Sequence, residues 1–323
     1  MNRRRVMAYC NSNGVRLCYE VFEPTQGRKA PALLLIMGLG AQMIAWPDAL
    51  CQDLAGRGWR VIRYDNRDAG LSQQLDELGV PNLESLMLRL ATGTPVLPPY
   101  ELGDMARDAL GLLDALAVRR AHVVGASMGS MVAQIMAATH PERLLSLGLM
   151  MTTSGNARLP RPSTAVMAAT MARPKDSNDH AALHAWYCSY FRTLEGSGYR
   201  SSDAELQAYV DASLARAYRP AGTARQTAAI LAADDRSELL RLIEVPTQII
   251  HGDEDPLTHL DCGKDVARKI PGAKLVVMQG MGHALPTPLL PKIAELIHDH
   301  ATAAADRDQG EVPPSTTNKA PVQ

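Results

Sequence analysis

The chain has 323 residues, of which 46% are hydrophobic and 21% are charged. This length and composition can bury a core of its own, which excludes a disordered or fibrous protein. Because 33 Lys and Arg residues nearly balance 34 Asp and Glu residues, the net charge of −1 excludes a general attraction to nucleic acid or an anionic membrane and favours a small-molecule partner.

Short apolar runs alternate with longer amphipathic segments along most of the chain. Two runs, 6–9 and 15–22, flank the turn-forming sequence Asn11-Ser12-Asn13-Gly14 and predict an antiparallel hairpin at a sheet edge. Six later runs predict buried strands over residues 32–36, 60–64, 122–125, 145–150, 247–251 and 274–278. Amphipathic segments predict helices over residues 47–57, 103–116, 128–139, 260–269 and 289–301. This alternation predicts an α/β fold with a mostly parallel eight-stranded sheet and helices on both faces.

Three segments depart from the alternation. Residues 152–236 have helical spacing and no strand-like run, so they predict a helical cap inserted between two strands. A smaller excursion, 73–99, contains one predicted helix over residues 82–91. Residues 302–323 are polar and predict a disordered tail. The expected domains are a core of residues 1–151 and 237–301, the cap, and the tail.

The most informative stretch is the predicted strand that ends in Gly125-Ala126-Ser127-Met128-Gly129 and runs directly into a helix. A G-x-S-x-G sequence between a strand and a helix is typical of a nucleophile elbow, a sharp turn that exposes the serine side chain. Glycine at positions 125 and 129 removes side chains that would collide with neighbouring backbone. The N-terminus of the following helix, which carries partial positive charge, then faces the negative charge that develops during attack by the serine. We predict Ser127 as a nucleophile.

A serine hydroxyl is a weak nucleophile and needs a general base that a third group holds in place. In the chain order Ser, acid, His, the base should follow a late strand. His283 meets this condition, in the loop Gly280-Met281-Gly282-His283 after the predicted 274–278 strand. The rival histidines begin a strand, end a helix or lie on the terminal helix: His122, His140, His298 and His300.

The acid should follow the preceding strand, which runs into Gly252-Asp253-Glu254-Asp255-Pro256. We predict Asp255, three residues beyond the glycine and fixed by Pro256, with Asp253 as the alternative. Glu254 is expected to face solvent. His251 is expected to pack in the loop rather than to act as a second base.

These three segments, in this order, resemble the catalytic segments of the α/β-hydrolase fold family. The resemblance covers residues 13–301 and is closest to the aclacinomycin methylesterase group and related macrolide esterases, through segments such as Trp46-Pro47-Asp48 and Gly280–Pro286. It implies a Ser127–His283–Asp255 triad and an oxyanion hole formed by the backbone N–H groups of Leu39 and Met128. Many members have His-Gly where this chain has Met37-Gly38, so a histidine that usually braces this loop is absent.

The cap is the expected source of substrate specificity. Candidate substrate-binding residues are aromatic or methionine side chains of the cap and residues beside the oxyanion hole: Trp186, Tyr187, Tyr190, Phe191, Met167, Met171, Tyr218, Met37 and Gly38. For each cap side chain taken singly, the helical spacing favours ordinary packing within the cap over contact with a ligand. Arg225 and Gln226 are expected to make structural contacts to the core. Asp65, Arg67 and Asp68 could hold a substrate, but a salt-bridged loop that supports the oxyanion turn is the preferred interpretation.

No cofactor or metal is expected. Gly38-Leu39-Gly40 lacks the third glycine of a dinucleotide fingerprint, and no phosphate-binding P-loop occurs. The five cysteines are scattered, with no C-x-x-C pair. They fit a reduced, cytoplasmic location. Arg3-Arg4-Arg5 precedes too short an apolar run for a signal peptide.

The predicted function is a carboxylic ester hydrolase that works through an acyl-enzyme. The resemblance and the large cap favour a bulky polyketide-type ester or a macrolactone, such as a macrolide, as substrate. A short-chain carboxylesterase, lactonase, thioesterase or perhydrolase is the alternative, because one triad supports many acyl transfers. A ligand-binding receptor that keeps the hydrolase scaffold is the remote alternative. A monomer or a homodimer is expected, with no nucleic-acid or membrane partner.

Overall fold

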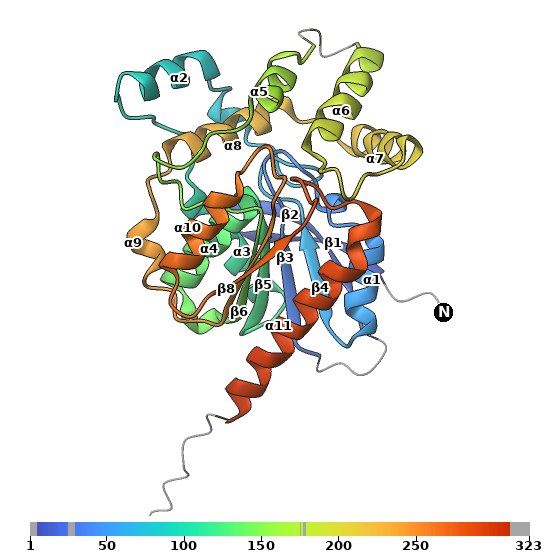
Figure 1. Ribbon diagram of the computed structural model, residues 1–323, viewed down its shortest axis with the longest axis vertical. Helices are drawn as coiled ribbons and strands as arrows, with labels where there is room; N and C mark the ends of the chain where they lie inside the picture. The colour runs from blue at the N-terminus through green and yellow to red at the C-terminus, as the bar shows by residue number, and fades with distance from the viewer. Residues whose placement is uncertain (1–4, 25–29, 175, 177–178, 311–323) are drawn as a thin grey trace, which may run out of the picture.

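The computed structural model describes residues 5–24, 30–174, 176 and 179–310 (Figure 1). Within these residues, eight strands form one sheet in the order β1-β2-β4-β3-β5-β6-β7-β8. The strands are β1 (Arg5–Ser12), β2 (Val15–Phe22), β3 (Ala32–Ile36), β4 (Arg60–Tyr64), β5 (Ala121–Ala126), β6 (Leu144–Met150), β7 (Thr247–Gly252) and β8 (Lys274–Met278). Strand β2 is antiparallel to β1 and β4, and all other neighbours are parallel. The predicted mostly parallel eight-stranded sheet is confirmed.

The predicted N-terminal hairpin is also confirmed. Ser12 pairs with Val15 across a two-residue turn formed by Asn13 and Gly14. Both turn residues have positive φ, 49° and 77°, which Asn and Gly adopt more readily than other residues.

Helices cover both faces of the sheet, as predicted. Helices α1 (Asp48–Gly56) and α11 (Leu290–Gly310) pack on one face, and α3 (Leu102–Ala115), α4 (Met128–Thr139) and α10 (Leu260–Lys269) pack on the other. The position of β3 in the sheet explains why its sequence is apolar throughout. Leu33 and Leu35 belong to the apolar cluster on the side of α1 and α11, whereas Leu34 and Ile36 belong to the cluster on the side of α3, α4 and α10, so both faces of the strand are buried.

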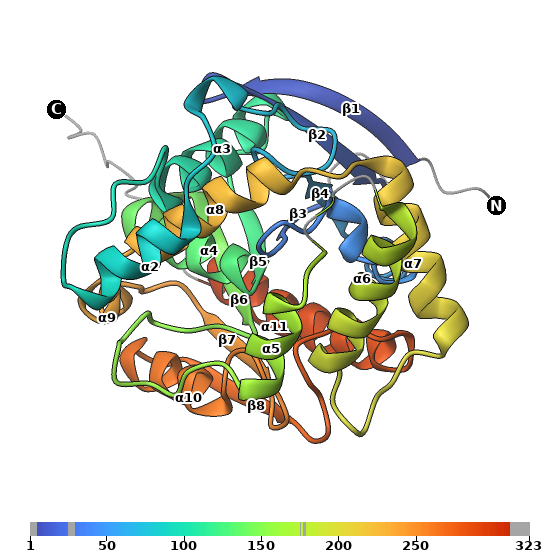
Figure 2. The same ribbon diagram turned by 90° about the horizontal axis from the view of Figure 1, so that it is seen from above.

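The connection from β6 to β7, residues 151–246, is helical and lies above the carboxyl ends of the strands (Figures 1 and 2); we call the part over which the cap is predicted, residues 152–236, the insertion. It contains α5 (Thr164–Met171), α6 (His180–Leu194), α7 (Asp203–Arg216) and α8 (Pro220–Ala232), followed by the short α9 (Ser237–Leu240). The smaller excursion contains α2 (Leu83–Ala91), which contacts α8. Short 3-10 turns are η1 (Met43–Ala45), η2 (Asp76–Leu78), η3 (Pro141–Arg143) and η4 (Thr287–Leu289).

The boundary predicted for the C-terminal tail is wrong. Helix α11 continues to Gly310, so residues 302–310 are helical rather than disordered. Alanine has the highest helix propensity, and four alanines occur at positions 301 and 303–305. Ala304 is also buried, so this turn gains packing energy that a polar tail would not. Residues 311–323 lie outside the described part of the chain.

Buried ion pairs join the insertion to the core. Arg225 of α8 contacts Asp68 at 2.7 Å, and both side chains are fully buried. Arg216 of α7 contacts Asp65 at 2.7 Å. Arg67 pairs instead with Asp108 of α3 at 2.6 Å. Asp65, Arg67 and Asp68 thus each have a charged partner within the protein, which supports the interpretation that they form a salt-bridged supporting loop rather than a substrate site. Removing one partner of such a buried pair would leave an uncompensated charge.

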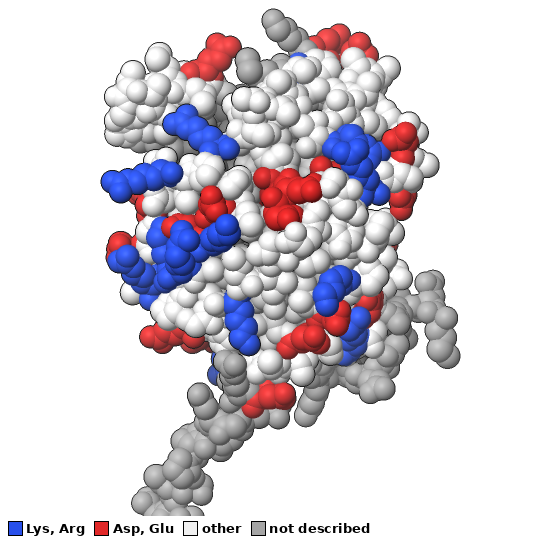
Figure 3. Space-filling view, viewed as in Figure 1, with Lys and Arg blue, Asp and Glu red and all other residues white. Residues whose placement is uncertain are grey.

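The surface carries both signs of charge. Figure 3 shows basic and acidic side chains lying next to one another on the face in view. Among the described residues, no helix combines the length and the apolar character that crossing a bilayer requires.

Candidate active site

Ser127 occupies a strained turn between β5 and α4. Its backbone has φ 54° and ψ −120°, a conformation that costs a non-glycine residue about 1–3 kcal/mol and is concentrated at functional sites. A Cβ atom at Gly125 would lie 2.3 Å from the Gly129 carbonyl oxygen, and one at Gly129 would lie 2.1 Å from the Ile36 carbonyl oxygen. Both flanking glycines are therefore needed for the turn to form, as a nucleophile elbow requires.

His283 and Asp255 are brought together at the ends of β8 and β7. His283 Nδ1 lies 2.7 Å from Asp255 Oδ2. Asp255 Oδ1 accepts hydrogen bonds from the backbone N–H groups of Leu257 at 2.9 Å and Thr258 at 2.7 Å. Burial acts to raise the pKa of Asp255, but the charge and hydrogen bond of His283 and the Thr258 N–H outweigh it, so the pKa lies below its ordinary value. Asp255 is therefore an ionised, fixed acceptor for His283.

The other two carboxylates of this loop have different partners. Asp253 Oδ1 accepts a hydrogen bond from the Gly280 N–H at 2.7 Å and so braces the loop that carries His283. Glu254 is exposed, as expected, and accepts hydrogen bonds from the backbone N–H and the hydroxyl of Ser197 in the insertion. Of the three acids of this loop, all of which the structure describes, Asp255 alone is hydrogen-bonded to His283.

Strand register places Ser127 at the same edge of the sheet as this pair. Ala126 pairs with Met150 of β6, and Met150 pairs with Ile250 of β7. Gly252 pairs in turn with Met278 of β8. The carboxyl ends of parallel strands meet at one edge, so the residues that follow β5, β7 and β8 are neighbours. Within the described residues, no hydrogen bond joins Ser127 Oγ to His283; catalytic hydrogen bonds often tighten only when substrate binds.

The loop after β3 runs beside the serine. A Cβ atom at Gly38 would lie 3.0 Å from Ser127 Cβ and 3.6 Å from Ser127 Oγ, so glycine permits this close approach. Leu39 follows in the same loop, and Met128 is the first residue of α4. The N–H groups in the first turn of a helix have no partner within the helix. Leu39, which follows Gly38, and Met128, which follows Ser127, therefore stay the candidate backbone donors of the predicted oxyanion hole.

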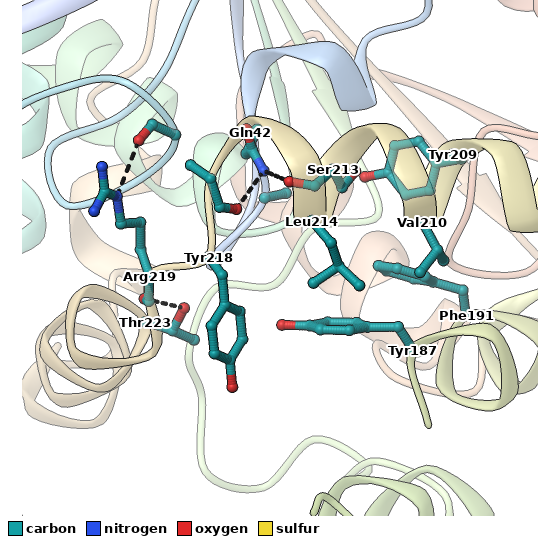
Figure 4. A pocket seen from close by; sticks show the side chains of 14 residues that line it. Gln42, Tyr187, Phe191, Tyr209, Val210, Ser213, Leu214, Tyr218, Arg219 and Thr223 are labelled. Atoms are coloured by element: carbon teal, nitrogen blue, oxygen red, sulfur yellow. Dashed lines mark hydrogen bonds between the residues drawn. The ribbon is translucent and has the colours of Figure 1, made fainter. Parts of the chain in front are cut away.

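A pocket lies between the 40–42 turn, which continues this loop, and the insertion (Figure 4). The empty space in the pocket, with the open solvent at its mouth included, is about 510 Å³. It is lined by the 40–42 turn, Gly70, residues of α6 and α7, the loop between α7 and α8, and the start of α8: Gly40, Ala41, Gln42, Tyr187, Phe191, Tyr209, Val210, Ser213, Leu214, Ala217, Tyr218, Arg219 and Thr223. Neither Ser127 nor His283 is among its lining residues, and Gly40 lies two residues beyond Gly38, which approaches Ser127 closely.

The predicted substrate-binding side chains divide between this pocket and other places. Tyr187 and Tyr218 line the pocket, as does Phe191. Trp186 instead stacks on Tyr190, with ring centroids 5.3 Å apart, and donates from Nε1 to the Ala169 carbonyl oxygen.

Two methionine candidates lie elsewhere. Met37 is buried in the apolar cluster that contains α1 and α11, and Met167 is 45% exposed on α5. The side chain of Met171 lies outside the described part of the structure.

Sequence reasoning missed the contribution of α7 to the pocket. Tyr209, Val210, Ser213, Leu214 and Ala217 recur with the spacing of one helical face. That spacing is visible in the sequence. Its assignment to a pocket rather than to packing requires the position of α7 relative to the 40–42 turn.

His251 lies beside Asp255, but its contacts are those of a buried packing residue. Its side chain is fully buried, and its Nε2 donates to the Thr258 carbonyl oxygen at 2.7 Å. Its Nδ1 has no partner in the described part of the chain. Burial lowers the pKa of His251 below its ordinary value, aided by the nearby His283 and His259 and opposed by the Thr258 carbonyl and Asp255. His251 is thus a neutral imidazole, which agrees with the predicted packing role.

This buried imidazole predicts a pH dependence of stability. The pKa of His251 in the unfolded chain is about 6.5 and is lower in the folded protein. As the pH falls below 6.5, His251 becomes protonated in the unfolded chain but stays neutral in the folded protein. The free energy of unfolding therefore falls with pH until the pH passes below the pKa of His251 in the folded protein. Urea denaturation at pH 7.5 and pH 5 should show a smaller fall for His251→Gln than for the natural protein. An equal fall in both proteins would contradict this assignment.

Comparison with known proteins agrees with this geometry. Residues 31–286 match the α/β hydrolase fold family. The chain is 30% identical over 299 residues to rhodomycin D methylesterase DauP of Streptomyces sp. strain C5, covering 84% of this chain and 91% of that protein. It is 31% identical over 295 residues, with the same shares, to rhodomycin D methylesterase DnrP of Streptomyces peucetius. These names agree with the predicted carboxylic ester hydrolase.

More distant proteins share the same fold. A putative carbamate hydrolase RutD of Pseudomonas syringae pv. syringae is 28% identical over 273 residues, which cover 82% of this chain and 92% of that protein. The structure of an enol-lactonase from Burkholderia xenovorans LB400 superposes with a TM-score of 0.71 at 24% identity, over 91% of this chain and 100% of that one. The chain therefore belongs to the α/β-hydrolase fold family.

Proposed function

We propose that the chain is a serine ester hydrolase that uses Ser127, His283 and Asp255 as its catalytic triad. The observation that carries the proposal is the 2.7 Å pair of His283 Nδ1 and Asp255 Oδ2 at the same sheet edge as the strained Ser127. The pair leaves His283 Nε2 as the proton acceptor for a serine hydroxyl. The insertion acts as a cap over these residues.

The reaction is a two-step acyl transfer to water. Ser127 Oγ attacks the ester carbonyl carbon while His283 Nε2 takes the hydroxyl proton, and the resulting oxyanion accepts hydrogen bonds from the N–H groups of Leu39 and Met128. The C–O bond to the alcohol breaks, and His283 gives its proton to the departing alcohol oxygen. Water then attacks the acyl-enzyme, His283 takes and returns a proton, and the acid and Ser127 are released.

The proposed substrate is a bulky polyketide-type ester. The pocket beyond Gly40 presents the rings of Tyr187, Phe191, Tyr209 and Tyr218, which suit a flat, unsaturated group. Burial raises the pKa of Tyr187 to about 12, so its hydroxyl stays neutral and can donate a hydrogen bond. A polycyclic substrate would extend through the open mouth of the pocket. The two relatives are named for a methylesterase activity on rhodomycin D, which favours a methyl ester over a macrolactone.

A substrate panel tests this proposal. Purified protein is assayed with an anthracycline methyl ester, a macrolactone, short-chain p-nitrophenyl esters and a small carbamate, and products are identified by mass. We expect kcat/KM for the anthracycline methyl ester to exceed that for the short-chain esters at least about 100-fold, a difference of about 2.7 kcal/mol in transition-state binding. Activity confined to short-chain esters would support a general carboxylesterase, and activity confined to the carbamate would support the chemistry named for RutD.

A fluorophosphonate probe separates an enzyme from a receptor that keeps the scaffold. Such probes phosphonylate an activated serine, so labelling of the natural protein supports the triad. Absence of both labelling and turnover would favour the ligand-binding receptor.

A further inference from the structure

We propose that Gln226, a residue of the insertion, is a positioning residue for the oxyanion hole. It holds the oxyanion loop, residues 37–40, in the conformation that aims the Leu39 N–H at the reacting carbonyl. This inference rests on the proposed function, because it assigns a role within the same site.

The Gln226 amide bridges two backbone segments that are far from it in sequence. Its Oε1 accepts a hydrogen bond from the Gly40 N–H at 2.7 Å, and its Nε2 donates to the Arg67 carbonyl oxygen at 2.7 Å. The side chain is fully buried. Because one partner is a donor and the other an acceptor, the orientation of the amide is fixed.

The other end of the oxyanion loop is tied to the same part of the core. Asn66 Nδ2 donates to the Met37 carbonyl oxygen at 2.8 Å. Residues 66 and 67 therefore hold the loop at both ends, directly at Met37 and through Gln226 at Gly40. Leu39 lies between these two attachments.

Helix α8 is itself fixed in place, so the brace has a rigid support. Arg225 makes its fully buried ion pair with Asp68, one residue beyond Arg67. A Cβ atom at Gly222 would lie 2.1 Å from the Asp68 carbonyl oxygen, which shows how closely α8 packs on this loop. This part of the insertion behaves as a continuation of the core rather than as a movable cover.

Loss of the brace should affect the chemical step more than substrate binding. Removing one oxyanion donor outright costs about 10²–10³ in kcat, and a donor displaced by about 1 Å costs up to about 10². We therefore expect Gln226→Met, which removes both hydrogen bonds at similar volume, to lower kcat about 10–100-fold. KM should stay within about twofold, because the pocket side chains are unchanged.

Two further variants make the test specific. Gln226→Glu keeps an acceptor for the Gly40 N–H and loses the donor to Arg67, so its kcat should fall between those of the natural protein and Gln226→Met. Gln134→Met is the matched control: Gln134 is also fully buried and accepts from Arg236 Nε at 2.9 Å and donates to Thr152 Oγ1 at 2.7 Å, away from the oxyanion loop. It should lower the unfolding temperature while kcat stays within about threefold.

The readouts are kcat, KM, the unfolding temperature and the inhibition constant of an aryl boronic acid. A boronate adduct of Ser127 places an oxygen in the oxyanion hole, so its affinity should weaken in Gln226→Met by about the same factor as kcat. The inference is overturned if Gln226→Met keeps kcat within twofold, or if Gln134→Met loses as much kcat as Gln226→Met. If Gln226→Met does not fold, the kcat values of Gln226→Glu and Gln134→Met are compared instead. The inference is then overturned if Gln226→Glu keeps kcat within twofold, or if Gln134→Met loses as much kcat as Gln226→Glu. Retained turnover in Ser127→Ala would instead overturn the proposed function itself.

Discussion

Ser127→Ala should lower kcat for ester hydrolysis by about 10⁴–10⁶, because it removes the atom that forms the acyl-enzyme. The remaining turnover would come from substrate binding and the oxyanion donors, which act without the nucleophile. The assay follows hydrolysis of the best ester of the panel, with burst kinetics to detect the acyl-enzyme. Labelling by the fluorophosphonate probe should disappear in the same variant.

A matched serine variant separates loss of chemistry from loss of folding. Ser146 of β6 is buried, and its hydroxyl lies 2.9 Å from His122 Nδ1 at the end of the sheet away from Ser127. Ser146→Ala should lower stability by about 1–3 kcal/mol but keep kcat near that of the natural protein. Comparable turnover of Ser127→Ala and Ser146→Ala would exclude Ser127 as the nucleophile.

The strands and the order of the site residues were predictable from the sequence because both depend on local chemistry. A strand buried on two faces, such as β3, is apolar throughout, and the apolar runs predicted the bounds of β3, β4 and β8 correctly. The elbow was predictable because Gly125 and Gly129 have a steric reason that no other residue satisfies. Asp255 was preferred over Asp253 from its spacing after Gly252 and from the Pro256 that follows it, and the contact with His283 agrees with that choice.

Features that depend on the packing of distant segments were not predictable in detail. Gln226 was expected only to contact the core, and its bond to Gly40 spans 186 positions of sequence. Tyr209 becomes a pocket residue through the placement of α7 against the 40–42 turn. The end of α11 depends on whether Ala304 finds a surface to pack against, which its alanine-rich sequence does not specify.

Asp255→Asn should lower kcat by about 10³–10⁴ with little change in folding. Asp255 accepts the Nδ1 proton of His283, which leaves the Nε2 lone pair directed at the serine. An asparagine can instead donate its N–H to Nδ1, which stabilises the other tautomer and places a proton on Nε2. The asparagine oxygen can still accept from Leu257 and Thr258, so the loop keeps its backbone contacts.

Asp253→Asn is the matched control in the same loop. Its oxygen can still accept from the Gly280 N–H, so the loop that carries His283 should remain in place and kcat should fall less than about tenfold. Both variants remove one negative charge two residues apart, so a general electrostatic effect on the site would lower kcat in both. A large loss confined to Asp255→Asn therefore measures the hydrogen bond to His283. The reverse order of the two variants would transfer the orienting role to Asp253.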